Sequence, residues 1–148
     1  MSDNFFIKEA LKEAKKALKK GEVPVGCIIV KDNKIISRAH NLTIKKNDPT
    51  AHAEILAIKK AAQKIGNYRL TNCDLYVTIE PCLMCAGGAI WARIKRIIFG
   101  VYDDKSGACG SVVNIANNKK INYHIEIKSG VLSSKCANLM KNFFKKKR

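Results

Sequence analysis

Two short motifs, with one predicted strand between them, constrain what this chain can fold into more than any other feature. The first reads H-x-E and contains His52 and Glu54, and the second reads P-C-x-x-C and contains Cys82 and Cys85. One imidazole and two thiols suit a Zn²⁺ ion and leave its fourth position open, whereas a structural zinc site is normally closed by a fourth protein ligand. Glu54 is placed to act as a general base beside such an ion. The fold must therefore bring two distant segments to one metal.

Both motifs lie where a helix is predicted to begin. Thr50 can cap a helix from about Ala51 to Ile65, and Pro81 suits the first turn of a helix that runs to about Trp91. Side chains at a helix start lean back toward the N-terminus, so both motifs can reach one ion beyond the helix ends. The positive end of the helix dipole also favours thiolate over thiol in the second motif.

The pattern of apolar residues predicts further helices and strands along the rest of the chain. Residues 2–20 read as an amphipathic helix. Asp32 and Asn33 form the turn of a hairpin, and the helix that begins at Pro81 separates two strands that should be parallel. The predicted strands are residues 23–30, 34–39, 74–79, 95–99 and 125–127, and a last helix covers residues 133–144. This order predicts a three-layer α/β fold in one domain, residues 1–148.

The formal net charge of +16 over 148 residues is far from that of an ordinary soluble chain. Such a basic protein is expected to bind a polyanion, with RNA or DNA the first candidate. The alternative is that a lysine-rich composition only solvates the surface. The basic first helix could also lie on a membrane, but its modest, alanine-rich apolar stripe favours packing on a sheet. No apolar run approaches the roughly 20 residues that span a bilayer.

The cysteines are expected to be reduced. No secretory signal is evident at the N-terminus, so we expect a cytoplasmic protein without disulfides. A lone C-x-x-C could be a redox pair or half of a zinc ribbon, but no second C-x-x-C is present. His40 and His124 are interpreted as ordinary surface or core residues. Beyond the two cysteines of the motif, four more are expected to pack as small apolar side chains: Cys27, Cys73, Cys109 and Cys136.

The chemistry available to these residues is hydrolytic. Zinc would lower the pKa of a bound water toward neutrality. Glu54 would accept the water proton, hydroxide would attack a ring carbon that bears an amino group, and Glu54 would return protons to the ring nitrogen and the departing amine. The H-x-E and P-C-x-x-C pair is the signature of zinc-dependent nucleobase deaminases. No organic cofactor is required.

Longer segments around the motifs carry a more specific likeness. They are D-P-T-A-H-A-E over residues 48–54, N-Y-R-L over residues 67–70 and L-Y-V-T-I-E-P-C-L-M-C-A-G over residues 75–87. Together they resemble the family of bacterial tRNA-specific adenosine deaminases, over almost the whole chain. The resemblance implies a three-layer α/β/α cytidine-deaminase-like fold with a mixed five-stranded sheet. It also implies hydrolytic deamination of adenosine to inosine at the wobble position of tRNA anticodons.

The same resemblance implies roles for individual residues. The three motif ligands would hold one zinc ion per subunit, and Glu54 would be the proton shuttle. Asn41 matches the base-contacting asparagine of the family. Asp103, Lys105 and Ser106 lie in the loop that the family places against the anticodon nucleotides, although this chain has a second acid directly after Asp103. The partners implied are a tRNA anticodon loop and a second copy of the chain in a homodimer.

Aromatic residues in two places have two interpretations each. Phe143 and Phe144 precede a basic tail, residues 145–148, and could stack on a loop nucleotide. Alternatively, at least one of them packs the last helix onto the core. Trp91 follows a run of small residues, 86–89, which suggests close helix packing either within one subunit or across a dimer.

Two other functions remain open from the sequence. One is a deaminase of free bases or nucleosides such as guanine or cytidine, for which so much positive charge would bring little advantage. The other is a non-catalytic, zinc-stabilised RNA-binding module, against which Glu54 and the missing fourth protein ligand argue.

Overall fold

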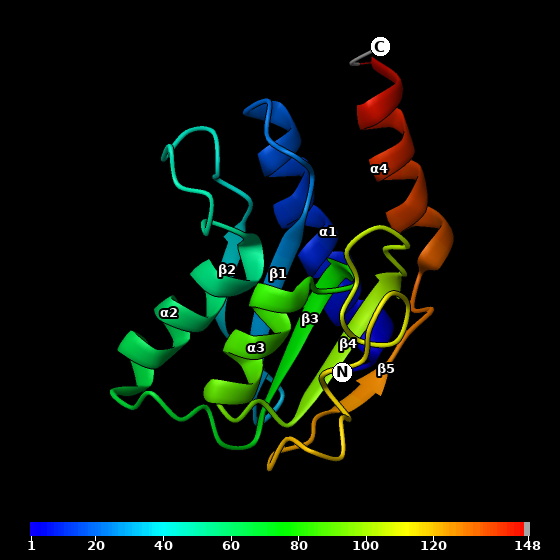
Figure 1. Ribbon diagram of the computed structural model, residues 1–148. Coiled ribbons are helices and arrows are strands. Elements are labelled where there is room, and N and C mark those ends of the chain that lie inside the picture. The colour runs from blue at the N-terminus through cyan, green and yellow to red at the C-terminus, as the bar shows by residue number, and fades with distance from the viewer. Residues whose placement is uncertain (147–148) are drawn as a thin grey trace.

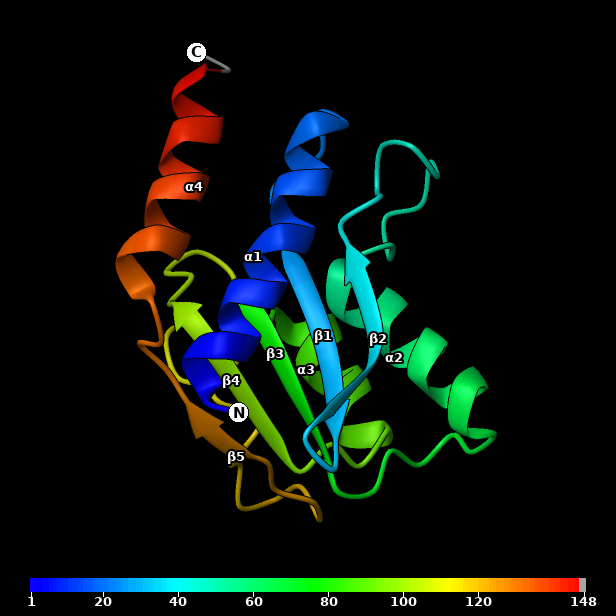
Figure 2. The same ribbon diagram turned by 180° about the vertical axis from the view of Figure 1, so that it is seen from behind.

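The described residues fold into one mixed sheet of five strands with two helices on each face (Figures 1 and 2). The structure is a computed structural model, and it describes residues 1–146. The helices are α1 (Asp3–Lys19), α2 (Ala53–Ile65), α3 (Leu83–Trp91) and α4 (Ser133–Lys146), and the strands are β1 (Gly26–Lys31), β2 (Lys34–His40), β3 (Cys73–Ile79), β4 (Arg96–Val101) and β5 (Glu126–Lys128). In Figure 1, α2 and α3 lie in front of the sheet, and Figure 2 shows α1 and α4 on the opposite face. The predicted three-layer α/β/α fold is confirmed.

The strand order β2-β1-β3-β4-β5 combines an antiparallel half with a parallel half. β1 pairs antiparallel with both β2 and β3, and β3 pairs parallel with β4 across the α3 crossover, as the strand–helix–strand pattern predicts. The short β5 continues the parallel half. The carboxyl ends of β3 and β4 therefore meet at one edge of the sheet, together with the end of β2.

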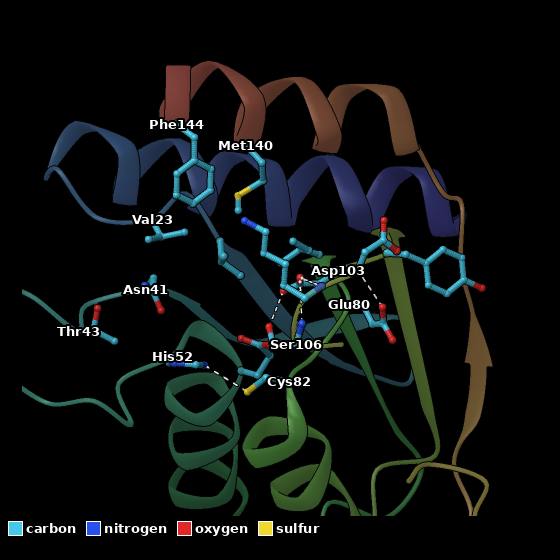
Figure 3. Close-up of a pocket in the computed structure, with 16 residues that line it drawn as sticks. Val23, Asn41, Thr43, His52, Glu80, Cys82, Asp103, Ser106, Met140 and Phe144 are labelled. Carbon is cyan, nitrogen blue, oxygen red and sulfur yellow. Dashed lines mark hydrogen bonds between the residues drawn. The ribbon is translucent and has the colours of Figure 1, made fainter. Parts of the chain in front are cut away.

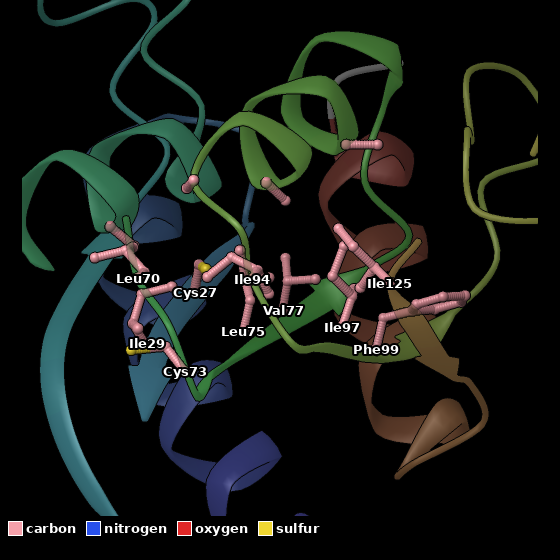
Figure 4. Close-up of a cluster of buried hydrophobic side chains, with 14 of the residues drawn as sticks. Cys27, Ile29, Leu70, Cys73, Leu75, Val77, Ile94, Ile97, Phe99 and Ile125 are labelled. Carbon is pink, nitrogen blue, oxygen red and sulfur yellow. The ribbon is translucent and has the colours of Figure 1, made fainter. Parts of the chain in front are cut away.

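The core has two layers because side chains alternate along each strand. Cys27 and Ile29 of β1 face α2 and α3, in a cluster that also holds Leu75 of β3 and Phe99 of β4 (Figure 4). Ile28, which lies between the two β1 residues, faces α1. Burial on both faces explains why these strands read as nearly continuous apolar runs in the sequence.

Gly26 is required where α1 crosses the beginning of β1. A Cβ at this position would collide with the backbone of Ala10 and Ala14. The alanines on this face of α1 allow the same close approach, since they are fully buried. The prediction that the first helix packs on the sheet is therefore confirmed. None of the helices within residues 1–146 is long and apolar enough to cross a membrane.

Four predicted boundaries are wrong by a few residues. The first strand begins at Gly26 and not at Val23, because Pro24 has no N–H for strand pairing and the N–H of Val25 bonds back to the carbonyl of Val23 at 2.8 Å. The predicted basic tail, residues 145–148, is split: α4 includes residues 145 and 146, and residues 147 and 148 lie outside the described part of the chain.

The predicted starts of α2 and α3 are also displaced. The N-cap of α2 is His52 and not Thr50, whose backbone N–H and hydroxyl both donate to Asp48 at 2.8 Å. The N-cap of α3 is Cys82, and Pro81 precedes the helix, where its carbonyl accepts a hydrogen bond from the N–H of Ala108 at 2.9 Å. The correction matters for the site, since it puts one metal-ligand candidate at each N-cap.

Candidate active site and metal centre

The two helix starts place three ligand atoms around one point. His52 Nδ1 lies 3.6 Å from Cys82 Sγ and 3.4 Å from Cys85 Sγ, and all three ligand atoms lie within 4.8 Å of one another. His52 and Cys82 come from the N-caps of α2 and α3, and Cys85 lies in the first turn of α3. Within residues 1–146 this is the one group of histidine, cysteine and acidic side chains with metal-binding geometry.

This geometry fits zinc. Tetrahedral zinc with Zn–N of about 2.05 Å and Zn–S of about 2.3 Å separates the nitrogen from each sulfur by about 3.6 Å. The two N···S distances in the structure, 3.6 and 3.4 Å, agree with that value. Three protein ligands would leave one position of a bound zinc ion for a non-protein ligand, and two of the three, His52 and Cys82, line a pocket.

The pKa values of the ligand side chains follow from their contacts with one another. The hydrogen bond from Cys85 and the neighbouring His52 lower the pKa of the Cys82 thiol to about 4. The same hydrogen bond raises the pKa of Cys85, and the Cys82 contact raises the pKa of His52. Cys82 is therefore a thiolate even without a metal, and the thiolate is the form in which a cysteine binds a metal ion.

Glu54 lies beside this cluster and is only 4% exposed. It occupies the first turn of α2, two residues after His52, and lines the same pocket. Burial raises the pKa of Glu54 to about 7, because the charged carboxylate loses its solvation. A carboxyl group with a pKa near neutrality can both accept and donate a proton under cellular conditions.

The pocket has a volume of about 790 Å³ and opens at the edge of the sheet where β2 and β3 end (Figure 3). His52 and Cys82 form its floor. Asn41 lies on one side, in the loop after β2, and Ser106 lies on the other side, in the loop after β4. Phe144 reaches in from α4, on the side opposite the floor.

The sequence-predicted substrate-binding residues all line this pocket: Asn41, Asp103, Lys105, Ser106 and Phe144. Asn41 is 6% exposed. The carboxylate of Asp103 is occupied within its own loop, where it accepts hydrogen bonds from the N–H groups of Lys105 and Ser106 at 3.1 and 3.3 Å and from the Ser106 hydroxyl at 2.7 Å. Asp103 therefore shapes the tip of the loop.

The two phenylalanines of α4 divide their roles. Phe143 is 6% exposed and belongs to the buried side of the helix, whereas Phe144 is 48% exposed and lines the pocket. The interpretation that at least one of them packs the last helix onto the core is confirmed by Phe143, whereas stacking of Phe144 on a nucleotide stays a prediction. For Trp91, packing within the core of one subunit is wrong, because the side chain is 79% exposed. The small residues before it do pack closely inside the subunit, since a Cβ on Gly88 would press on Ile55 of α2.

The remaining cysteines and histidines have no place in the metal site. His40 lies between Lys20 and Glu13, and His124 lies 2.9 Å from the carbonyl of Asn118. The other four cysteines are free and buried in the two core clusters, as predicted: Cys27, Cys73, Cys109 and Cys136.

Sequence reasoning missed two buried carboxylates that hold the walls of the pocket. Glu22, fully buried, accepts hydrogen bonds from the N–H groups of Ile44 and Lys45 at 3.0 and 2.7 Å, in the loop after β2. Glu80, 2% exposed, accepts several from the loop after β4. The only signal in the sequence is an acidic residue inside an apolar run, directly before Pro81.

An open metal position beside a buried carboxylate is the arrangement that activates water, and the site is that of a zinc-dependent hydrolytic enzyme. The chain belongs to the family of the cytidine and deoxycytidylate deaminase zinc-binding region, which matches residues 1–101.

Individual relatives are similar over most of the chain. The tRNA-specific adenosine deaminase of Bacillus subtilis is 43% identical over 146 residues, which are 99% of this chain and 91% of that protein. A solved structure from biochemical and structural studies of A-to-I editing by tRNA:A34 deaminases superimposes with a TM-score of 0.88 at 41% identity and covers 91% of this chain and 98% of its own. The X-ray structure of guanine deaminase from Bacillus subtilis has a TM-score of 0.66 at 41% identity, over 69% of this chain and 66% of its own.

Proposed function

We propose that this protein deaminates adenosine to inosine by hydrolysis at wobble position 34 of tRNA anticodons. The observation that carries the proposal is the placement of Glu54 beside a zinc-shaped ligand set at the floor of an open pocket. The likeness to tRNA-specific adenosine deaminases over nearly the full chain supports the substrate. The proposed unit is one deaminase domain, residues 1–148, that acts in the cytoplasm without an organic cofactor.

The roles of the site residues follow from their positions. His52, Cys82 and Cys85 would hold the zinc ion, which when bound supplies the Lewis acidity that makes water a nucleophile near neutral pH. Glu54 accepts the proton from the attacking water. It passes this proton to the purine ring nitrogen, then takes the proton of the new C6 hydroxyl and passes it to the departing amine, so that ammonia leaves from C6 and a carbonyl remains.

Substrate recognition is proposed to use the three sides of the pocket. The amide of Asn41 can hydrogen-bond the edge of the base, and the half-exposed ring of Phe144 can stack on a nucleotide of the loop. Lys105 and Ser106 lie on the opposite wall, where they face the RNA backbone or a neighbouring base. An anticodon loop already presents splayed bases, so extrusion of one adenosine costs less than from a duplex.

The net charge of +16 supports a polyanionic substrate. A homodimer is also proposed. What supports it is Trp91, which is 79% exposed at the end of α3 and borders a second, mainly apolar pocket of about 410 Å³. An exposed tryptophan beside an apolar depression is typical of a protein–protein interface.

The proposal is tested with a transcribed anticodon arm of arginine type that carries adenosine at the wobble position. The zinc-loaded protein is expected to release one ammonia for each inosine formed, and the same arm with guanosine at that position should release none. Absence of inosine from the first arm would overturn the proposal.

A guanine deaminase is the second candidate, because the similar guanine deaminase structure is 41% identical over 69% of this chain. Free guanine, cytidine and adenosine are therefore assayed beside the RNA. Ammonia from guanine without inosine in the anticodon arm would favour this candidate, whereas turnover of the arm alone favours the tRNA enzyme.

A further inference from the structure

Glu80 is a buried acidic residue that the mechanism above does not use. It follows the last residue of β3 and precedes Pro81 and Cys82, so it connects the central sheet to the metal-ligand turn. Its side chain is 2% exposed and points toward the loop after β4, which forms one wall of the pocket (Figure 3).

Both oxygens of this carboxylate accept hydrogen bonds from the loop. Oε1 accepts from the N–H of Asp103 at 2.9 Å and from the hydroxyl of Ser111 at 2.5 Å. Oε2 accepts from the N–H of Cys109 at 2.9 Å and from the N–H of Ser111 at 3.1 Å. The donors lie at both ends of the segment 103–111, so one side chain closes the loop at its base.

No lysine or arginine within residues 1–146 forms an ion pair with Glu80. The buried charge is therefore compensated by main-chain N–H groups that converge only in this conformation of the loop. A different loop conformation would leave a buried carboxylate without donors, which is strongly unfavourable. Glu80 consequently stabilises one position of the wall over others.

The same wall is joined to the metal-ligand turn by main-chain contacts. Ala108 donates its N–H to the carbonyl of Pro81 at 2.9 Å, and Cys82 pairs with Gly107 in a single β-bridge. Gly107 fits there because it has no side chain, since a Cβ would collide with the carboxylate of Glu80. The distance between the wall and the metal site is thus fixed through Glu80 and its neighbours.

Further hydrogen bonds connect the base of the loop to its tip. Asp103, whose N–H is held by Glu80, accepts hydrogen bonds from Lys105 and Ser106 through its own carboxylate. Lys105 and Ser106 are exposed and line the pocket. Their side chains are in place for RNA only while the base of the loop is held.

We propose that Glu80 is a positioning residue, whose carboxylate fixes the loop of residues 103–111 as the RNA-facing wall of the pocket beside Cys82. This inference rests on the proposed function, because it assigns the wall to the anticodon loop. Glu80 acts through hydrogen bonds to the wall and transfers no proton to the substrate.

The test is Glu80→Gln, which keeps the size of the side chain but replaces one acceptor oxygen by an NH₂ group that faces an N–H donor. Amide hydrogen exchange is expected to accelerate at Asp103, Cys109 and Ser111, while the amides of β3 and β4 stay protected. Zinc content should remain that of the wild type. KM for the anticodon arm should rise by about tenfold, with kcat within about threefold of the wild type.

Two further variants separate positioning from general destabilisation. Tyr123→Phe removes hydrogen bonds to the carbonyls of Arg93 and Ile94 at 3.1 and 2.9 Å, away from the pocket, and should leave KM unchanged. Ser111→Ala removes the hydroxyl, which contacts Glu80 and also the carbonyl of Asp103 at 2.8 Å, and keeps the backbone donor to Glu80. It should raise KM less than Glu80→Gln does.

Protected loop amides in Glu80→Gln, or a KM equal to that of Tyr123→Phe, would overturn the inference. If Glu80→Gln does not fold, Ser111→Ala decides: raised KM at normal zinc content supports the inference, and unchanged KM overturns it. Failure of the proposed function is recognised separately, because the wild type would then form no inosine. In that case amide exchange, which needs no RNA, still decides whether Glu80 holds the wall.

Discussion

Replacing Glu54 by glutamine is expected to remove activity and, at the same time, to stabilise the metal-free protein. Glutamine has nearly the same shape, so the packing of the first turn of α2 is kept. It cannot accept a proton from water, however. General acid–base groups contribute about 10²–10⁴-fold to turnover, so inosine formation by Glu54→Gln should fall by at least about 100-fold, with zinc still bound.

The gain in stability follows from the cost of burying the ionised carboxylate. Burial raises the pKa of Glu54 from 4.5 to about 7. The folded state therefore holds this proton to higher pH than the unfolded state does, and stability is lost as pH rises from about 4.5 to about 7. A difference of about 2.5 units corresponds to roughly 3 kcal/mol at and above pH 7. Glutamine has no charge to desolvate, so the Tm of the metal-free variant should rise by roughly 6–12 °C.

Calorimetry of the metal-free proteins at about pH 4 and about pH 8, beside the inosine assay on the zinc-loaded proteins, measures both effects. The two proteins should melt together at the lower pH and apart at the higher pH. Glu126→Gln, which changes an exposed carboxylate, is the matched control and should alter neither property. Wild-type turnover by Glu54→Gln would refute the proton-shuttle role. An equal Tm at both pH values would refute the burial argument.

Three further outcomes are expected. Cys82→Ala should lose both zinc, measured by atomic absorption, and turnover, because two ligands no longer hold the ion; retained zinc would contradict the ligand assignment. Affinity for the anticodon arm, measured by fluorescence anisotropy, should fall by about tenfold or more between about 50 and 200 mM salt if the basic surface binds phosphates, and a flat response would contradict this. Gly26→Ala should lower the free energy of unfolding by about 1–3 kcal/mol in urea titration, because the new Cβ meets the backbone of Ala10 and Ala14; wild-type stability would show that α1 can move away.

Some features of the site could be predicted because they depend on residue chemistry and local order. The ligand types, their spacing and the single strand between the motifs suffice to predict a zinc site between two helix starts. The parallel pairing of β3 and β4 follows from one crossover helix. Asn41 was predicted from resemblance and Phe144 from its place beside a basic tail, and the structure brings both to the pocket.

The N-caps show where local reasoning fails. Thr50 is a better N-cap than His52 by residue type. In the structure, however, both the backbone N–H and the hydroxyl of Thr50 donate hydrogen bonds to Asp48. Pro81 suits a first helical turn, but its carbonyl accepts a hydrogen bond from the N–H of Ala108, which lies far along the chain. In each case a competing hydrogen bond decides where the helix begins.

By itself, then, the sequence determined the metal chemistry, the order of the elements and the positive charge. The first two depend on residues that are close together along the chain, and the net charge is a sum over all residues. Only the tertiary structure decided which side of the last helix faces the pocket, so that Phe144 lines it while Phe143 is buried. It also decided that Glu80 is held by Asp103, Cys109 and Ser111. A buried charge is stabilised by whichever donors the fold brings to it, and no local pattern encodes donors that lie more than one strand away.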